Sequence, residues 1–485
     1  MDAMIANEIE DSGNGSPAPS FSASIRELLT IAIPLAISAG SVTMMHIANR
    51  LFLTWHSQEA LAAVLPASMW NWTLISIFVG TAQYVNTFVS QYEGAKRPDR
   101  VASAIWQGAY FAIFGGILLT ILSPLTAGVF YLFPHGDAVQ KLEVQYFLIV
   151  CLGSLPVVLS GVLGCFFSGR QFTRITMVVN LTGSLINIVL DYILIFGWGP
   201  IPSYGIAGAA WATVTAEFSI LFIYLFLLWR SQDAKRYQLW SAWRFDRELF
   251  LRMLRFGLPS GFHFFVDVCG FSVFIMLIGL IDGRVLAATT LAFNLNTMAF
   301  LPVVGLGSAV SILVGKRIGE GRPNAAAQTT WLAVGIAMIY MLIFGAIFVG
   351  LPDLILSPYA HEGNAEDFAA IRPVVIRLLW FVAAYSLFDA MAIVFGAALR
   401  GAGDTRFAML FSFFCGWALM VLPTWIGVRY YHWGVLAAWS ACTVFVVTLG
   451  LGLGLRFYRG KWRSMRVIET APPPDAVPVG ELEPA

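Results

Sequence analysis

The sequence contains one stretch twice, and this internal repeat constrains the fold more than any other feature. Residues 34–98 align without a gap with residues 259–323, which lie 225 positions later in the chain. The matches begin at a shared proline and end at a shared Gly-x-x-Arg-Pro turn, which runs from Gly94 to Pro98 in the first copy. A repeat of this length predicts two units of similar fold within one chain.

Composition indicates the solvent in which these units fold. Hydrophobic residues make up 58% of the 485 residues and charged residues 12%, whereas an ordinary soluble domain has about 25% charged residues. A soluble core does not need so much apolar surface, so the units are predicted to lie in a lipid bilayer. The net charge of +1 and the lack of a basic stripe argue against a nucleic-acid partner. The five cysteines lie in apolar runs without paired spacing and are predicted to be buried hydrophobes.

Twelve apolar segments are long enough to cross a hydrocarbon core of about 30 Å as helices. The segments are continuously apolar rather than alternating with a period of two, which favours helices over a β-barrel. The predicted fold class is therefore an all-α polytopic membrane protein with six spans in each half. The predicted spans are residues 26–53, 60–90, 102–131, 143–168, 176–197, 206–230, 256–281, 286–316, 326–351, 373–399, 408–428 and 434–457.

Basic residues in the connections predict the orientation of the spans. Placing the N-terminus in the cytoplasm puts most of the 29 Lys and Arg residues on the inner side, as the positive-inside rule requires. Six spans per half return the chain to the same side, so both termini are predicted to be cytoplasmic. The halves are then parallel repeats, two six-helix bundles related by a pseudo-two-fold axis along the membrane normal.

The predicted domain organisation consists of two lobes, a linker and two tails. The N-terminal tail and the end of the chain from residue 471 onward are polar and rich in proline or serine, which is typical of disorder. The linker has tryptophans among basic residues, which predicts a segment lying on the inner leaflet. The predicted parts are a disordered cytoplasmic tail (1–25), an N-terminal lobe (26–230), a cytoplasmic linker (231–254), a C-terminal lobe (255–457) and a second cytoplasmic tail (458–485).

Matched prolines predict two bent helices. Pro34 lies in the first span and Pro259 in the seventh, at equivalent positions of the two copies. A proline ring inside a helix removes a backbone donor and crowds the preceding turn, so both spans should bend there.

Polar groups inside the spans are the candidates for function, because they are costly in lipid and usually face a cavity. Two pairs have the spacing i, i+4, which places both members on one face of a helix. These pairs are Asn187 with Asp191 and Tyr385 with Asp389, and Asp267 is a further acid in the seventh span. The acids do not match between the copies, whereas Gly, Pro, Asn and Arg positions do. Shared positions are therefore interpreted as architecture and unshared ones as chemistry.

A structural role is the alternative interpretation for each polar group. A carboxyl group can be neutral and hydrogen-bonded to a neighbouring helix. For Glu217, His46 and His263 the spacing indicates no partner, so this structural interpretation is favoured. Asn71 and Asn296 occupy equivalent positions of the copies and are interpreted as hydrogen-bonding parts of the scaffold.

Several motifs, each weak alone but specific together and in this order, resemble the MATE family of multidrug and toxic compound extruders over about residues 26–457. They include the Pro34 helix, the Gly-x-x-Arg-Pro turn with its second copy, and Leu-Arg-Gly-Ala-Gly-Asp-Thr at 399–405. They also include Asn-Ile-Val-Leu-Asp at 187–191 and Gly-Ile-Ala-Gly-Ala-Ala-Trp-Ala-Thr at 205–213.

The resemblance implies a secondary active multidrug efflux transporter rather than an enzyme. Such a protein exports small organic cations in antiport with Na⁺ or H⁺ by alternating access of a central cavity. It implies a monomeric, multi-pass protein of the cell inner (plasma) membrane, with the coupling ion in place of a cofactor.

The resemblance also implies two sites. The ion or substrate site of the N-terminal lobe comprises Asn49, Asn187, Asp191 and Thr213, with Asn49 where the family more commonly has Asp.

The NorM-like branch of the family adds an ion-coupling site in the C-terminal lobe, at Asp267, Tyr385 and Asp389. The two acids are a possible Na⁺ site, but a proton needs only the acids, so the sequence leaves the coupling ion open.

Two other classes of protein were considered. A lipid-linked oligosaccharide flippase of the same superfamily would share the repeat but needs basic side chains in its cavity to hold a pyrophosphate, and mid-span basic residues are nearly absent. An intramembrane enzyme needs a nucleophile with its base, a metal cluster or paired acids at fixed spacing, and the sequence has no such motif. It also has no P-loop for ATP.

Overall fold

A computed structural model describes residues 21–132, 136–357 and 365–469 of the chain. Over these residues the structure contains twelve helices long and apolar enough to cross a membrane, which confirms the predicted fold class. The spans, in chain order, are α2 (Phe21–His56), α3 (Gln58–Gln83) with α4 (Val85–Gly94), α5 (Pro98–Thr126) with η1 (Ala127–Leu132), α6 (Asp137–Cys151) with α7 (Ser154–Ser168), α8 (Thr173–Phe196), α9 (Ile206–Arg230), α11 (Arg247–Gly279), α12 (Gly283–Gly319), α13 (Pro323–Gly350), α15 (Ala365–Ala402), α16 (Thr405–Cys415) with η3 (Gly416–Val421) and α17 (Leu422–Tyr430), and α18 (Val435–Tyr458). Three short elements complete the order, α10 (Gln232–Arg236), α14 (Pro352–Leu356) and η4 (Lys461–Ser464).

The first described segment corrects the predicted N-terminal tail. The prediction of disorder for residues 1–25 is wrong for residues 21–25, because α2 begins at Phe21; residues 1–20 lie outside the described residues. At the other end, residues 458–485 are predicted as a cytoplasmic tail with disorder only from residue 471 onward. Up to residue 469 the chain forms η4, and Trp462 is buried with its ring stacked on Phe457 at 4.7 Å. Residues 470–485, which include the stretch predicted to be disordered, lie outside the described part of the chain.

The structure confirms the prediction for most of the cysteines and leaves the predictions for the two prolines and the linker open. Pro34 lies inside α2 and Pro259 inside α11, and both helices continue through the proline; the bends remain a prediction. All five cysteines are free, and four of them are buried, as predicted. The linker contains α10 and is attached to α5 by Trp106, whose Nε1 donates to the carbonyl of Leu239 at 2.7 Å. Its position on a leaflet remains a prediction.

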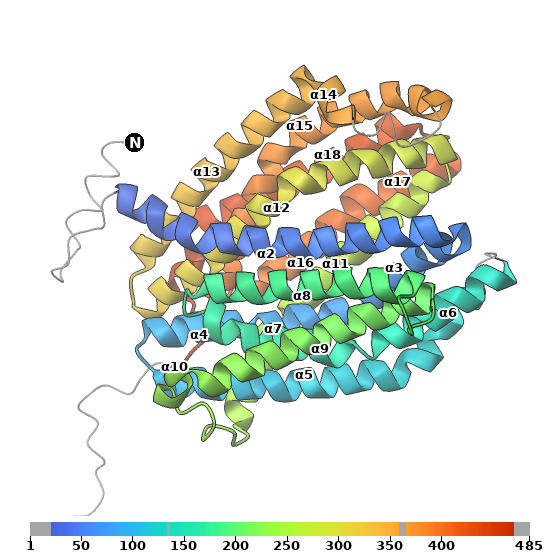
Figure 1. Cartoon of the computed structure of the whole chain (residues 1–485). Coiled ribbons are helices and arrows are strands. Elements are labelled where there is room, and N and C mark those ends of the chain that lie inside the picture. Colours follow the sequence, from blue (N-terminus) through green and yellow to red (C-terminus); the bar gives the residue numbers. More distant parts are fainter. Residues whose placement is uncertain (1–20, 133–135, 358–364, 470–485) are drawn as a thin grey trace, which may run out of the picture.

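At one end of the molecule, the first helix of each half packs into the core of the other half. We use N-lobe for α2 to α9 and C-lobe for α11 to α18. Figure 1 shows the N-lobe helices α5, α6, α8 and α9 on one side, α12, α13, α15 and α18 on the other, and α2 between them. The first turns of α2, with Leu28 and Ile31, are nevertheless buried in the C-lobe cluster. The first turns of α11, with Leu249 and Met253, are buried in an N-lobe cluster. Each lobe therefore supplies the start of its first helix to the core of the other.

Symmetric glycine contacts join the lobes at the end where α2 begins. A Cβ on Gly94 would lie 2.0 Å from the carbonyl oxygen of Lys316, and a Cβ on Gly319 would lie 2.1 Å from the carbonyl oxygen of Gln91. Gly94 and Gly319 are equivalent in the repeat, and so are Gln91 and Lys316. The two contacts are thus one contact repeated by a pseudo-two-fold relation. Only glycine permits this approach of two backbones.

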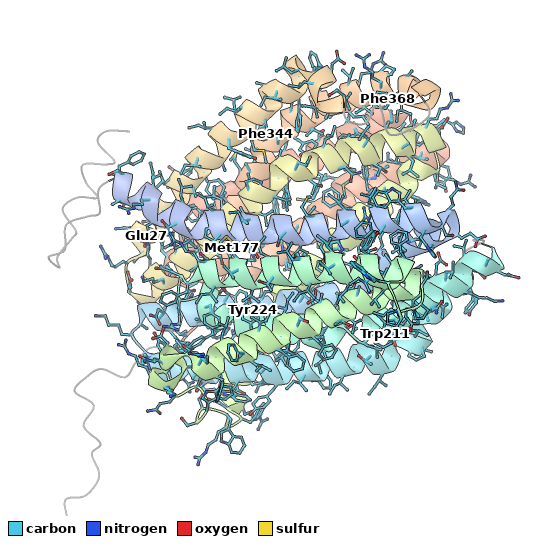
Figure 2. All side chains as sticks on the ribbon, in the orientation of Figure 1. Glu27, Met177, Trp211, Tyr224, Phe344 and Phe368 are labelled. Atoms are coloured by element: carbon cyan, nitrogen blue, oxygen red, sulfur yellow. The ribbon has the colours of Figure 1, made fainter. Side chains whose placement is uncertain are left out.

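Ion pairs and hydrogen bonds cover the same end of the molecule. Glu469, after η4, binds Arg100 at the start of α5 with a 2.8 Å contact, and Arg252 near the start of α11. The Tyr92 hydroxyl donates at 2.7 Å to Oε2 of Glu469, the oxygen that Arg252 also contacts. A separate pair joins Glu27 of α2 to Arg317 of α12 at 2.7 Å, and Figure 2 labels Glu27 at this end. The final described segment therefore ties the start of α11 to the N-lobe.

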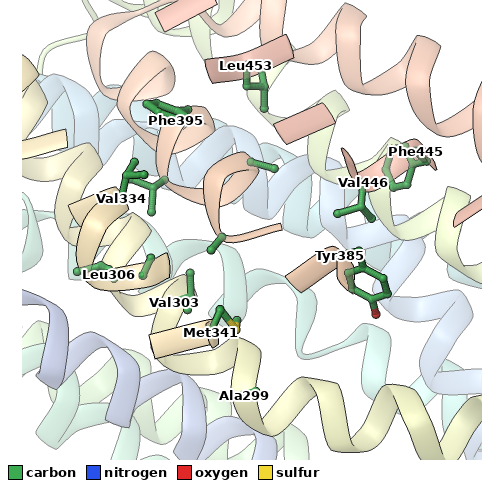
Figure 3. Packing of buried hydrophobic residues seen from close by; sticks show 14 of the residues in the cluster. Ala299, Val303, Leu306, Val334, Met341, Tyr385, Phe395, Phe445, Val446 and Leu453 are labelled. Atoms are coloured by element: carbon green, nitrogen blue, oxygen red, sulfur yellow. The ribbon is translucent and has the colours of Figure 1, made fainter. Parts of the chain in front are cut away.

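The C-lobe core is the largest hydrophobic cluster. It is built from α12, α13, α15 and α18, and Figure 3 shows Leu306, Met341, Tyr385 and Phe395 among its members. The buried side of α15 faces this cluster along most of its length, because Val375, Leu378, Val382, Ala390 and Val394 are fully buried. This packing fixes the rotation of α15, and with it the position of the polar residues on that helix.

We predict that Gly94→Ala destabilises the closed contact between the lobes. The added methyl group would overlap the carbonyl of Lys316, and overpacking of this kind costs about 1–3 kcal/mol. The melting temperature of the purified protein in detergent should fall. Gly335→Ala is the matched control, because a Cβ there meets nothing within 4 Å; equal stability of the two variants would contradict the prediction.

We predict a pH-dependent contribution from Glu469. Burial opposes its charge, but the Tyr92 hydrogen bond and the charges of Arg100 and Arg252 outweigh burial and hold the pKa of Glu469 below its usual value. Its stabilisation is therefore fully present above the ordinary glutamate pKa and lost as the pH falls through the lowered pKa. At pH 7, Glu469→Gln should cost about 1–2 kcal/mol, measured as a lower melting temperature.

The control for Glu469 is Asp99→Asn. Asp99 is 65% exposed and pairs with Arg97 at 3.4 Å, so its loss should cost at most about 1 kcal/mol. A melting-temperature difference between wild type and Glu469→Gln that stays constant down to acidic pH would show that the charge of Glu469 does not stabilise this end.

Candidate functional site

The N-lobe residues predicted to form a site lie together in the structure. Asp191 of α8 is fully buried, and the Asn49 amide of α2 approaches its Oδ1 at 3.4 Å. Asn187 lies one turn before Asp191 on the same face, as the i, i+4 spacing predicted, and Thr213 of α9 lies next to it. Three helices therefore bring Asn49, Asn187, Asp191 and Thr213 to one point.

The orientation of the Asn187 amide follows from its neighbours. With its nitrogen towards Asp191, the amide donates to Oδ2 at 2.9 Å and its oxygen accepts from the Thr213 N–H at 3.2 Å. The opposite orientation leaves only a long 3.4 Å contact with the Thr213 hydroxyl. We adopt the first orientation, because a buried polar group that stays unpaired is costly. Asp191 then accepts one hydrogen bond on each oxygen, from Asn187 and Asn49.

Hydrophobic packing holds this polar cluster in place. Leu53 follows Asn49 by one turn and Ile195 follows Asp191 by one turn, and both are fully buried in the same hydrophobic cluster. Tyr146 of α6 belongs to that cluster, and its hydroxyl accepts from Ser68 at 3.5 Å. The polar cluster therefore has little freedom to rearrange without disturbing the apolar packing next to it.

The C-lobe acid Asp267 is accessible and has a histidine partner. Its side chain on α11 is 37% exposed, and its Oδ2 lies 3.5 Å from Nε2 of His263, one turn earlier on the helix. The same Nε2 lies 2.8 Å from the hydroxyl of Ser412 on α16. Arg400 of α15 is within electrostatic range of both Asp267 and His263. Asp267 thus belongs to a small group of polar residues from three helices.

Of the other two predicted C-lobe residues, Asp389 lies near Asp267 but not in contact with it. Asp389 is within electrostatic range of Asp267, yet the described residues show no hydrogen bond or ion pair to its carboxylate. Tyr385 is almost fully buried, and its ring packs at 6.5 Å from that of Trp439. The Trp439 indole is in turn fixed by a 3.3 Å hydrogen bond to Thr289. The three residues share a lobe without forming a direct cluster in this conformation.

Sequence reasoning missed the partners of His263. The sequence indicated no partner, but the structure places His263 between Asp267 and Ser412. The signal was present in the sequence, since His263 and Asp267 have the same i, i+4 spacing that was recognised in Asn187 and Asp191. The contact with Ser412 could not be predicted, because 149 residues separate it from His263.

The remaining polar candidates make fewer contacts. His46 is exposed on α2, and Arg50 is the charged residue near it. Glu217 is half-buried on α9, and no described ionisable group lies in electrostatic range of it. Asn71 donates to the Cys151 sulfur at 3.4 Å, which agrees with a scaffold role.

The donor set for a cation at Asp267 is small. The described residues contain no group of three or more His, Cys, Asp or Glu side chains placed to hold a metal ion. A bound Na⁺ would therefore take carboxylate oxygens from Asp267 or Asp389 and its other ligands from hydroxyl, carbonyl or water oxygens. A proton or an organic cation needs only the carboxylates and their surroundings.

Comparison with known proteins gives matches over most of the chain. The family model described as MatE matches residues 34–193 and 259–426, one stretch in each half. The multidrug resistance protein PmpM of Pseudomonas aeruginosa is 28% identical over 465 residues, which cover 94% of this chain and 95% of that protein. The multidrug resistance protein NorM of Burkholderia vietnamiensis is 26% identical over 439 residues, 88% of this chain and 94% of that protein.

Solved structures show the same fold. A MOP superfamily transporter from Pyrococcus furiosus superposes with a TM-score of 0.80 at 18% identity, covering 90% of this chain and 95% of that one. An outward-facing multidrug resistance MATE family transporter of the same superfamily also gives a TM-score of 0.80, at 19% identity, with 90% and 96% coverage.

We predict that Asn187→Leu destabilises the N-lobe. Leucine has the same branching and the same number of side-chain heavy atoms but leaves one oxygen of Asp191 without its donor, which should cost about 1–3 kcal/mol. The melting temperature in detergent measures the loss. Thr182→Val is the control on the same helix, because the Thr182 hydroxyl binds only the carbonyl of Val178 within α8; a comparable loss in both variants would show that the Asp191 contact is not the cause.

Proposed function

Because the chain belongs to the MATE family, whose model matches both of its halves, we propose that it is a secondary active multidrug efflux transporter of the bacterial inner (plasma) membrane. It exports organic cations in antiport with Na⁺ or H⁺, by alternating access to a path between the lobes. The observation that supports this most directly is the pair of membrane-embedded acids in the C-lobe, Asp267 and Asp389, which lie within electrostatic range of each other.

Competition for negative charge provides the coupling in this proposal. Two carboxylates that are close in a medium of low dielectric repel each other, so a cation that binds there relieves the repulsion. An organic cation and the coupling ion cannot occupy the same carboxylates together. Each therefore displaces the other, and this mutual exclusion is the minimum requirement for antiport. The 37% exposure of the Asp267 side chain is compatible with access from an aqueous path.

The N-lobe cluster has a secondary role in this proposal. It has one carboxylate, Asp191, which is buried and held by the Asn49 and Asn187 amides. A cation there would have to displace hydrogen bonds that already satisfy both oxygens. Asn49 supplies a neutral amide where a second acid would supply charge, so the cluster binds cations more weakly than the C-lobe pair.

The proposal also assigns the conformation. With both termini in the cytoplasm, as the basic residues of the connections favour, the glycine contacts at Gly94 and Gly319 close the cytoplasmic end. Loading of a substrate from the cytoplasm then requires these contacts to separate. The two glycine contacts lie in one interface and would separate together. The lobes can therefore exchange between two discrete arrangements.

We predict that Asp267→Asn and Asp389→Asn each reduce gradient-driven efflux at least about tenfold, which corresponds to about 1.4 kcal/mol of lost interaction. Tyr385→Phe should have a milder effect, because it removes a hydroxyl and no charge. Efflux of a fluorescent organic cation from proteoliposomes, under imposed pH or Na⁺ gradients, measures both the rate and the coupling ion.

Controls separate transport from folding. The amount of each variant in the membrane is measured alongside, and Asp137→Asn serves as the control at an exposed acid on the first residue of α6. Wild-type efflux by a well-expressed Asp267→Asn/Asp389→Asn double variant would refute the C-lobe site. Movement of a fluorescent lipid without movement of any organic cation would instead favour the flippase alternative.

We predict that Asp191→Asn lowers efflux but retains coupling. The amide replaces a carboxylate that already has two neutral donors, so the N-lobe should pack less well while the C-lobe acids still bind the ion. The ratio of efflux with and without the imposed gradient should stay close to that of the wild type. Loss of gradient dependence in this variant would make the N-lobe cluster the principal ion site.

A further inference from the structure

We propose that the linker between the lobes is a preformed binding surface for anionic phospholipid headgroups. This linker surface combines three exposed aromatic side chains with four exposed basic ones, all between residues 235 and 247. The sequence predicts only that the segment lies on a leaflet, whereas the structure indicates which lipids it binds. The inference goes beyond the proposed efflux function and does not depend on what the protein transports.

Helix α5 holds the backbone of the linker in place. The Gln107 amide donates to the carbonyl of Arg244 at 3.3 Å, and its oxygen accepts from the N–H of Asp246 at 3.3 Å. The Tyr110 hydroxyl donates to the carbonyl of Trp243. These bonds use backbone groups of the linker and leave its side chains available. The surface is therefore ordered before a lipid binds, which lowers the entropic cost of binding.

The charges of the linker are divided between inner contacts and the surface. Each of its three acids is paired with an arginine: Asp233 with Arg170 at 2.8 Å, Asp246 with Arg100 at 2.9 Å, and Glu248 with Arg252. Four basic residues are exposed, and the described residues show no ion pair to them: Lys235, Arg236, Arg244 and Arg247. The unpaired charge of the linker is therefore entirely positive, and it attracts an anionic partner.

Aromatic side chains lie among these basic residues. Trp240, Trp243 and Phe245 are 46%, 60% and 58% exposed. The Phe245 ring also packs on that of Phe250 at 5.1 Å, which fixes its position. Tryptophan is enriched where a membrane meets water, and aromatic residues beside lysine and arginine are typical of segments that lie in this interface.

The neighbouring helices favour a lipid over a soluble partner. The linker follows α9 and leads into α11, two predicted spans, and Figure 1 shows α10 at the end of the bundle where α2 begins. Phe222, Phe226 and Trp229 are exposed along one face of α9, with spacings of four and three residues. This apolar face ends directly before the linker, so lipids beside α9 have their headgroups at the level of the linker surface. The inner leaflet supplies anionic headgroups there.

A label on the linker tests the inference. Ser241 is exposed between Trp240 and Trp243, and Ser241→Cys accepts the fluorophore NBD, whose emission shifts to the blue when it leaves water. The wild type, labelled in the same way, gives the background from the five native cysteines. In phosphatidylcholine vesicles, the emission should shift to the blue as phosphatidylglycerol is added to both leaflets. High salt should reverse the shift, because it screens the charges.

Paired variants test the role of charge. Each basic residue close to an anionic surface contributes about fivefold to lipid binding. Arg244→Gln/Arg247→Gln, made in the labelled protein, should therefore lose most of the shift. Arg459→Gln/Lys461→Gln is the matched control, since it removes two exposed basic residues outside the linker, and it should respond like the parent protein. The melting temperature in detergent verifies that each variant is folded.

Three results would overturn the inference. The first is an emission that phosphatidylglycerol does not change in the folded, labelled protein. The second is an equal shift in pure phosphatidylcholine, which would show that the aromatic residues insert without recognition of headgroup charge. The third is an equal loss in the control pair, which would assign the effect to overall charge. None of these measurements involves efflux, so the proposed function is tested separately.

Discussion

The approach of two backbones at Gly94 and Gly319 is the constraint on which the rest of the structure depends. Any side chain at either position would overlap a carbonyl of the opposite lobe. The contact brings α4 onto α12, and the first turns of α2 and α11 are then buried in the opposite cores. Hydrogen bonds surround the contact, because backbone N–H and C=O groups that are buried at the interface need hydrogen-bond partners. Gln91 shows this, since its amide donates to Gly401 at 2.9 Å and accepts from Val467 at 3.0 Å.

The two lobes solve the problem of a carboxylate in a membrane in different ways. In the N-lobe, two amides satisfy Asp191 and apolar residues enclose it, so the charge is held by neutral donors. In the C-lobe, the Asp267 side chain is 37% exposed and lies 3.5 Å from His263. The first arrangement favours a fixed structure, whereas the second favours exchange of one cation for another. This difference is the physical reason for proposing that ion coupling takes place in the C-lobe.

The sequence predicted the parts of the molecule that depend on periodicity and repetition. The fold class, the twelve spans and the NorM-like membership of the MATE family are confirmed. In the N-lobe, Asn187 and Asp191 lie together because they share a helical face, as their spacing predicted. Prediction failed at the end of the N-terminal tail, where residues 21–25 begin the long helix α2. The contacts of Glu469 and Ser412 could not be predicted either, because their partners are distant in the chain and are not related to them by the repeat. Asp389 shows a different limit of the sequence. Its i, i+4 spacing from Tyr385 predicts that the two residues share a helical face, but it does not predict the distance from Asp389 to Asp267 on another helix.

Arg400 connects closure of the lobes to the C-lobe acids. Its carbonyl accepts a 3.0 Å hydrogen bond from the Tyr84 hydroxyl of the N-lobe, next to the Gln91 contact with Gly401. Its guanidinium lies within electrostatic range of Asp267. A cation bound at Asp267 would weaken the electrostatic attraction between Asp267 and Arg400. The position of this one residue on α15 therefore affects both the polar contacts between the lobes and the charge of the site. A transporter needs such a link, because ion binding can shift the equilibrium between two arrangements only by its difference in affinity for them.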